Sequence, residues 1–235
     1  MMNKATELRK IILERINNLK VEFENHPSKF KNEKCLHYRF HDLLIDNTPD
    51  YSSSIYKIRW ELDTNRKYDK KKFNPEEYRN LNRLIKECSG REARGHERKD
   101  LLKTSGQRKG GEGMKRRGEI DMVLECESTS PKLCIAIEFS LDTKYSGVGF
   151  FIHSYNDFLK LTEEASARGA NYDFQGYVLR YVTNEISKEK LGCYAKLLEY
   201  LYKYPQWQNK VSRIKFDLIS PSSFSISKNV EGWLK

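Results

Sequence analysis

The stretch GEIDMVLECESTSPKLCIAIEFS, residues 118–140, decides how the middle of this chain folds. Two runs rich in Ile, Val, Leu and Met flank a turn that contains Ser and Pro, a pattern typical of a β-hairpin. Asp121 lies inside the first run and Glu138 inside the second. A carboxylate within a core strand is costly unless it is paired or binds something positive. The two acids therefore mark a candidate binding site.

The register of this hairpin follows if Asp121 lies opposite Glu138, which also places Val123 opposite Ala136. Directly opposed residues of an antiparallel pair point to the same face, with Cβ atoms about 5 Å apart. That face is predicted to be small and acidic, whereas the other is strongly apolar and is expected to pack on a helix layer. The apolar face carries Ile120, Met122, Leu124, Ile135, Ile137 and Phe139.

Hydrophobic periodicity along the rest of the chain predicts a mixed α/β domain with a mixed central sheet flanked by helices. We expect helices over 4–20, 36–45, 74–88, 150–166 and 186–203, and strands over 55–62, 119–125, 133–139, 175–182 and 213–220. The tail after residue 220 is polar, with isolated apolar residues. With 235 residues, the chain suits a single domain over 1–235.

Residues 64–117 differ from the rest and are interpreted as a basic insertion. Residues 89–117 hold ten basic and four acidic residues, more than half of the net charge of +10. Such a charge favours a polyanionic partner, with nucleic acid ahead of an anionic membrane surface. A solvated loop without a ligand is the alternative. The residues predicted to contact nucleic acid are Arg108, Lys109, Lys115, Arg116 and Arg117.

The acidic pair suits a divalent cation. Unshielded carboxylates at this separation repel each other and raise one pKa, and a bound cation removes that cost. Mg²⁺ uses one or two protein carboxylates and keeps several waters, which leaves room for a phosphate oxygen. We predict Mg²⁺ at Asp121 and Glu138, with Mn²⁺ as a substitute. The alternative is that both acids face solvent, or pair with Arg or Lys from the insertion.

The motif GEID, followed after the hairpin by IAIEFS, resembles the active-site strand pair of the PD-(D/E)XK nucleases, the restriction-endonuclease-like superfamily. The resemblance implies that Asp121 and Glu138 are the two metal-binding acids and that Phe139 is the spacer. It implies a core of helix, three strands, helix and strand, which 36–62 and 118–182 can supply. The implied activity is metal-dependent hydrolysis of phosphodiester bonds in DNA by a restriction- or repair-type endonuclease, and such enzymes often act as homodimers.

One position departs from the family pattern. Ser140 stands where the family usually has Lys, so another residue must supply the catalytic cation. Lys144 is the first candidate because it leaves the same strand end, and Arg180 is the second. Glu119, predicted beside Ser140, is a candidate third acid. Ser140 is also the main support for a catalytically inactive nucleic-acid-binding protein of the same fold. A third hypothesis is a basic α/β protein that binds a protein or RNA scaffold.

The helix expected over 36–45 offers further polar residues. The resemblance implies an additional acid from this helix, for which Asp42 is available, although a surface role fits it as well. His37 and His41 are four residues apart and can share one helix face, a spacing that can bind a metal. Partly buried or surface histidines without a ligand are the alternative.

Composition also bears on location. No apolar run approaches the roughly 20 residues needed to cross a bilayer. The first twenty residues mix acids and bases and lack the hydrophobic region of a secretory signal. The five Cys are widely spaced and form no CxxC, which fits reduced thiols. We therefore expect a cytoplasmic protein that does not associate with membranes.

Overall fold

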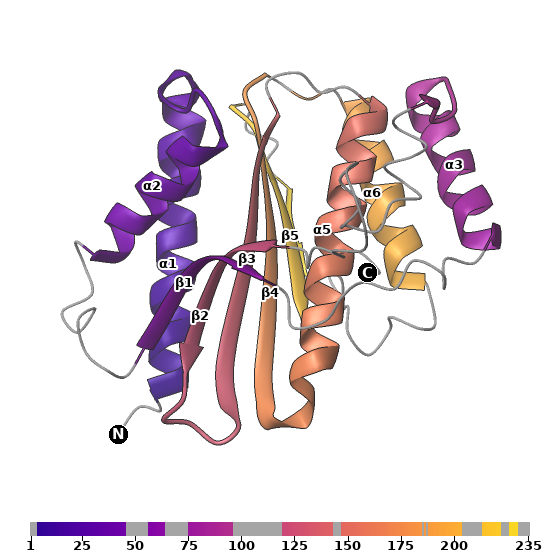
Figure 1. The fold of residues 1–235 in the computed structure, drawn as a ribbon. Helices are drawn as coiled ribbons and strands as arrows, with labels where there is room; N and C mark the ends of the chain where they lie inside the picture. Colours follow the sequence, from indigo (N-terminus) through magenta and orange to yellow (C-terminus); the bar gives the residue numbers. More distant parts are fainter. Residues whose placement is uncertain are drawn as a thin grey trace, which may run out of the picture.

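The computed structural model describes residues 4–45, 56–63, 75–95, 119–142, 147–184, 186, 188–203, 213–221 and 226–229. Within them, one mixed sheet lies between two helical layers, with α1 and α2 on one face and α5 and α6 on the other (Figure 1). The strands are β1 (Tyr56–Asp63), β2 (Glu119–Cys126), β3 (Lys132–Asp142), β4 (Tyr172–Val182), β5 (Ile214–Ile219) and β6 (Ile226–Asn229). The helices are α1 (Lys4–Asn25), α2 (Glu33–Ile45), α3 (Pro75–Ser89), α5 (Gly147–Arg168) and α6 (Lys188–Lys203).

The sheet runs in sequence order from β1 to β6. Strands β1, β2 and β3 are antiparallel neighbours, β3, β4 and β5 are parallel, and β6 returns antiparallel at the edge. Parallel neighbours need a crossover, and α5 and α6 supply the two that occur here. The predicted mixed sheet flanked by helices is confirmed. Strand β6 was not predicted, because it lies in the tail that reads as polar.

The predicted hairpin register is confirmed where the structure pairs the strands. Met122 lies opposite Ile137 and Val123 opposite Ala136. Beyond Met122, the backbone amide of Phe139 donates a hydrogen bond of 2.7 Å to Asp121 Oδ2. A side chain on β2 thus takes the place of a backbone acceptor at the point where the paired stretch of β2 and β3 ends. Asp121 is therefore held at a fixed position by the main chain of the neighbouring strand.

Both faces of the hairpin are buried, each under its own helical layer. Met122, Leu124 and Ile137 pack with α1 and α2, as expected for the apolar face. The other face, predicted to be small and acidic, carries Val123 and Ala136, which are fully buried under α5. Ile120, expected beside Met122, packs instead in this second core, at the end of β2 beyond its pairing with β3.

Helix α3 lies within the segment 64–117 that the sequence marks as an insertion. Its residues Leu81 and Ile85 are fully buried, and the helix packs against α5 and α6. This part of the segment thus contributes to the second core. Among the described helices, none is long and apolar enough to cross a membrane.

Candidate metal centre

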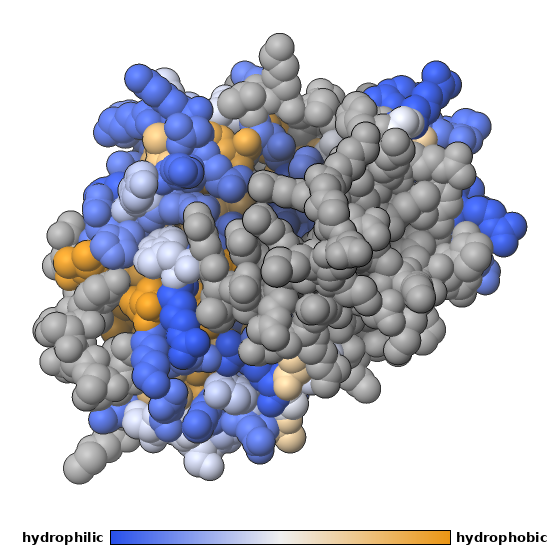
Figure 2. Space-filling model, viewed as in Figure 1, coloured by the Kyte–Doolittle hydropathy of each residue, from blue (hydrophilic) through white to orange (hydrophobic). Residues whose placement is uncertain are grey.

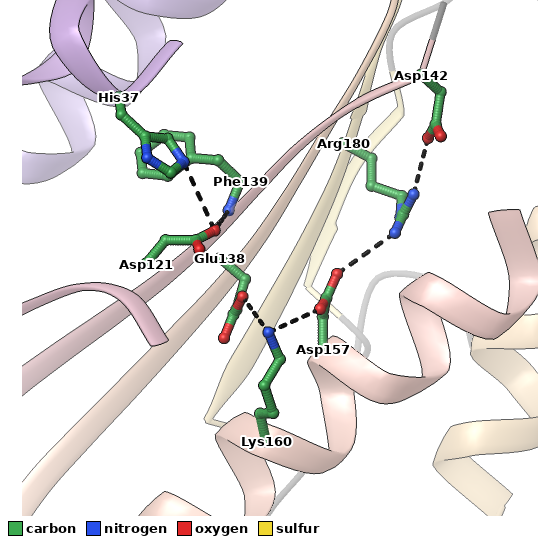
Figure 3. Close-up of polar contacts among 8 residues, drawn as sticks. All are labelled: His37, Asp121, Glu138, Phe139, Asp142, Asp157, Lys160 and Arg180. Carbon is green, nitrogen blue, oxygen red and sulfur yellow. Dashed lines mark hydrogen bonds and ion pairs between the residues drawn. The ribbon is translucent and has the colours of Figure 1, made fainter. Parts of the chain in front are cut away.

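Polar side chains from five elements converge where β2 and β3 separate (Figure 3). Strands carry most of the acids and α5 supplies a lysine, while α2 closes the site from the opposite layer. The converging residues are His37 of α2, Asp121 of β2, Glu138 and Asp142 of β3, Asp157 and Lys160 of α5, and Arg180 of β4. The arrangement follows from the crossover, which lays α5 across the strands that hold the acids.

Asp121 is largely buried, with 19% of its side chain exposed. Its Oδ2 accepts the Phe139 amide and lies 3.7 Å from His37 Nε2. Burial is the main cause that raises the pKa of Asp121 to about 7, and the carboxylates of Asp157 and Glu33 raise it further. Lys160 and the hydrogen bond from the Phe139 amide lower this pKa, but by less. Near neutral pH this carboxyl is therefore about half protonated without a cation.

Glu138 is the most deeply buried acid of the site, with 1% of its side chain exposed. Burial raises its pKa well above the usual value, and the carboxylates of Asp121 and Asp157 raise it further, while Lys160 lowers it. Lys160 Nζ donates to Glu138 Oε2 at 2.6 Å. The second oxygen, Oε1, is buried and has no hydrogen-bond partner among the described residues.

Lys160 is the cation that pairs with Glu138, the second acid of the motif. Its ammonium lies 2.6 Å from Glu138 and 3.1 Å from Asp157, one turn earlier on α5. Burial alone would lower its pKa, but the carboxylates of Glu138, Asp157 and Asp121 outweigh burial and raise the pKa well above its usual value. Lys160 therefore keeps its charge near neutral pH and donates hydrogen bonds.

Arg180 extends the charged chain across the sheet. Its guanidinium is fully buried, lies 2.7 Å from Asp142 and 3.3 Å from Asp157, and stacks 4.9 Å above the Phe150 ring. Each of its acids is thereby fixed in place. The order Asp142, Arg180, Asp157, Lys160, Glu138 alternates in sign, so the two cations offset two of the three acids on this wall of the site.

Helix α2 forms the opposite wall. Asn32 accepts a hydrogen bond from the Cys35 amide and caps the helix, so Glu33 lies in the first turn, where a negative charge is favourable. Ligand atoms of Glu33, His37 and Asp121 lie within 4.8 Å of one another. The Glu33 side chain is exposed at the rim, yet desolvation and the Asp157 carboxylate raise its pKa.

These residues fit a divalent cation. Five carboxyl groups face two permanent cations, Lys160 and Arg180, and three of the acids have raised pKa values. The buried Glu138 Oε1 has a free lone pair at the site. Carboxylate oxygens suit Mg²⁺ and Mn²⁺, and one imidazole among them favours a transition metal over Mg²⁺. The fit thus rests on charge, on donor chemistry and on an oxygen that lacks a partner.

Only some of the predicted site residues lie at the site. Asp121 and Glu138 do not share one face, contrary to the prediction, because Asp121 turns toward His37 of α2 whereas Glu138 contacts Lys160 of α5 on the other face of the sheet. The two acids are nevertheless close enough that the Asp121 carboxylate raises the pKa of Glu138. Arg180 lies at the site, where it pairs with Asp142 and Asp157. Asp42 is exposed on α2. Lys144, the side chain of Glu119, and the basic residues Arg108, Lys109, Lys115, Arg116 and Arg117 lie outside the described residues.

Sequence reasoning missed Lys160, Asp157, Asp142 and Glu33. One signal was available for α5, where Asp157, Lys160, Glu164 and Arg168 recur at three- and four-residue spacing beside the apolar stripe. The last two serve a different purpose, because Arg168 pairs with the buried Glu125 of β2 and Glu164 of its own helix. That charged stripe therefore pairs with two buried acids on the sheet, Glu138 of β3 and Glu125 of β2.

No family model, curated protein or solved structure matches this chain.

Proposed function

We propose that this protein is a metal-dependent nuclease that hydrolyses phosphodiester bonds in DNA, as a restriction- or repair-type endonuclease. The observation that carries the proposal is the contact of Lys160 with Glu138, which supplies from α5 the cation that Ser140 lacks. Apart from α3, which lies between β1 and β2, the order α2, β1, β2, β3, α5, β4 also supports a restriction-endonuclease-like core, since it follows the expected order of helix, three strands, helix and strand. A cytoplasmic location and a homodimer that cuts both strands belong to the same proposal.

Asp121 and Glu138 would hold the ion, with Glu33 and His37 as further donors on the α2 side. When bound, the ion polarises the phosphate and lowers the pKa of a water. Asp121 must give up its proton to bind, and the Phe139 amide keeps its oxygen oriented. Lys160 keeps its charge and donates hydrogen bonds, so it suits a phosphate oxygen as the negative charge grows.

An inactive nucleic-acid-binding protein of the same fold is the second candidate. It is favoured by the ion pairs that hold Lys160 to both Glu138 and Asp157, because salt bridges of this kind also stabilise a scaffold. The two candidates differ in whether DNA is cut.

Cleavage of supercoiled and linear DNA by purified protein in Mg²⁺, Mn²⁺ or EDTA tests the proposal. We expect cleavage with either metal and none with EDTA. Asp121→Asn, Glu138→Gln and Lys160→Met should each reduce the rate by at least about 100-fold, the usual cost of losing a charge-stabilising group. Lys144→Ala should leave the rate close to wild type if Lys160 supplies the cation.

Asp42→Asn is the matched control, because Asp42 is an exposed acid on α2 that lies outside the cluster. Wild-type protein that binds DNA tightly without cutting it in either metal would exclude the nuclease and support the inactive protein. Full activity of Lys160→Met would remove Lys160 from the mechanism.

A further inference from the structure

A pocket opens beside the candidate metal centre, between α2 and β1. Its volume is about 260 Å³ and it is lined by Lys34, His37, Tyr38, His41 and Trp60. Four of the five lining side chains are rings. On the side of the molecule where α2 and β1 lie, hydrophobic residues interrupt a hydrophilic surface (Figure 2).

The rings of this pocket are arranged around Trp60. The His37 ring lies 6.0 Å from Trp60 at an interplanar angle of 30°, and the His41 ring lies 5.7 Å away at 59°. Tyr38 is 68% exposed, which is unusual for so large a side chain. A ring left in solvent beside other rings has a face available for a planar ligand.

The pocket is continuous with the metal centre through one residue. His37 lines the pocket, and its Nε2 lies 3.7 Å from Asp121 Oδ2. A group that enters the pocket is therefore separated from the acids by a single side chain. Lys34, at the pocket rim, adds a positive charge suited to a phosphate.

We propose that this pocket binds one unstacked nucleobase next to the phosphate that is cut, so that the substrate carries an unpaired nucleotide at that position. The inference rests on the proposed nuclease function and specifies its substrate. Aromatic rings and an adjoining cation are the elements with which proteins bind single strands. A base inside a duplex has both faces covered by its neighbours, so it must leave the stack to enter such a pocket.

Size supports a single ring system as the occupant. The pocket is smaller than the roughly 300–1,000 Å³ of sites that enclose a drug-sized ligand. It is also predominantly lined by rings and not by the aliphatic side chains that a helical partner would require. A planar heterocycle with an attached phosphate matches both the rings and Lys34.

The test measures binding in EDTA, where the proposed cleavage cannot take place. A fluorescent eight-nucleotide single strand is titrated with protein by anisotropy, and the base is then removed at one position at a time. We expect one position at which loss of the base weakens binding about tenfold, within the range for one base stacked on an aromatic side chain. Trp60→Ala should weaken binding of the intact strand by a similar factor and show no further loss at that position.

Two further variants show whether weaker binding comes from the loss of an aromatic ring or from misfolding. Trp60→Phe should restore most of the affinity, because the ring is retained. Tyr38→Ala, at a highly exposed position, should weaken binding about threefold without unfolding the protein. Val21→Ala, at an exposed position on α1 outside the pocket, is the control and should leave affinity unchanged.

Uniform affinity along the abasic series would overturn the proposal, and so would a positional loss that persists in Trp60→Ala or a clear preference for intact duplex. A positional loss that depends on Trp60 supports the pocket even if DNA is never cut, in which case only the nuclease function fails.

Discussion

Replacing Asp121 by Asn should stabilise the metal-free protein. In the folded state the pKa of Asp121 is about 7, compared with 3.8 for an unperturbed Asp. The folded protein binds this proton more tightly than the unfolded chain, so ionisation of Asp121 opposes folding. Asn cannot ionise, yet its side-chain oxygen can still accept the Phe139 amide that Asp121 binds. The substitution therefore removes a cost and keeps the anchoring hydrogen bond.

The size of the effect follows from the two pKa values. A tenfold change in proton affinity is worth about 1.4 kcal/mol. The cost of ionising Asp121 is negligible below pH 3.8, grows between pH 3.8 and 7, and is complete above pH 7. It reaches about 4 kcal/mol at pH 8.5 and about 2 kcal/mol at pH 5. Asp121→Asn should thus gain about 2 kcal/mol more at the higher pH.

Urea unfolding in EDTA at pH 5 and pH 8.5 measures both gains. Asp42→Asn, which changes an exposed acid of α2, should alter the free energy of unfolding by less than about 0.5 kcal/mol at either pH. Added Mg²⁺ should then raise the free energy of unfolding of the wild type but not of Asp121→Asn, because a ligand stabilises only the state that binds it.

A loss of stability in Asp121→Asn would refute this reasoning, as would a gain of the same size at both pH values. Either result would mean that the buried carboxyl is not held in a costly charged state. Equal stabilisation of wild type and variant by Mg²⁺ would place the ion elsewhere.

Three further outcomes are expected. Mg²⁺ should bind about tenfold more weakly at pH 6 than at pH 8, as read from thermal shifts over a Mg²⁺ titration, because the proton on Asp121 competes below its pKa of about 7. Arg168→Met should lower the free energy of unfolding by about 1.5–3 kcal/mol in urea, because it removes charged hydrogen bonds from the buried acids Glu125 and Glu164 while Arg59 still lies 3.2 Å from Glu125, and the proposed DNA cleavage per folded molecule should persist. Gly176→Ala should cost about 1–3 kcal/mol in the same assay, because the added Cβ would lie 3.1 Å from Leu161 Cδ1 and 3.2 Å from Ile214 Cγ1.

Local periodicity was sufficient to predict most of the fold. Each helix and strand expected from the sequence is present within a few residues, and the hairpin register is the one that places Met122 opposite Ile137. Strand β6 was not predicted, because four residues in a polar tail give no alternating pattern. Ile120 was misplaced because strict alternation does not hold where β2 leaves β3.

The site was predictable only in part. Asp121 and Glu138 stood out because they interrupt apolar runs on a hairpin whose two strands are close in sequence. Lys160 did not, because its contact with Glu138 depends on how the crossover lays α5 over the sheet, which no local pattern encodes. Glu33 was missed for the same reason, since α2 meets β2 only through the packing of distant segments.

The charge differs between the α5 side and the α2 side of the candidate metal centre, and this difference affects the stability of the fold. On the α5 side Lys160 and Arg180 offset two of the three acids, so the donors left for an incoming ion are Glu138 Oε1, Asp121 and the first turn of α2. An ion bound between these groups would link the layer of α1 and α2 to the hairpin of β2 and β3. Removal of the ion by a chelator would then weaken the packing of α1 and α2 on the sheet first, while ion pairs still join the strands to α5.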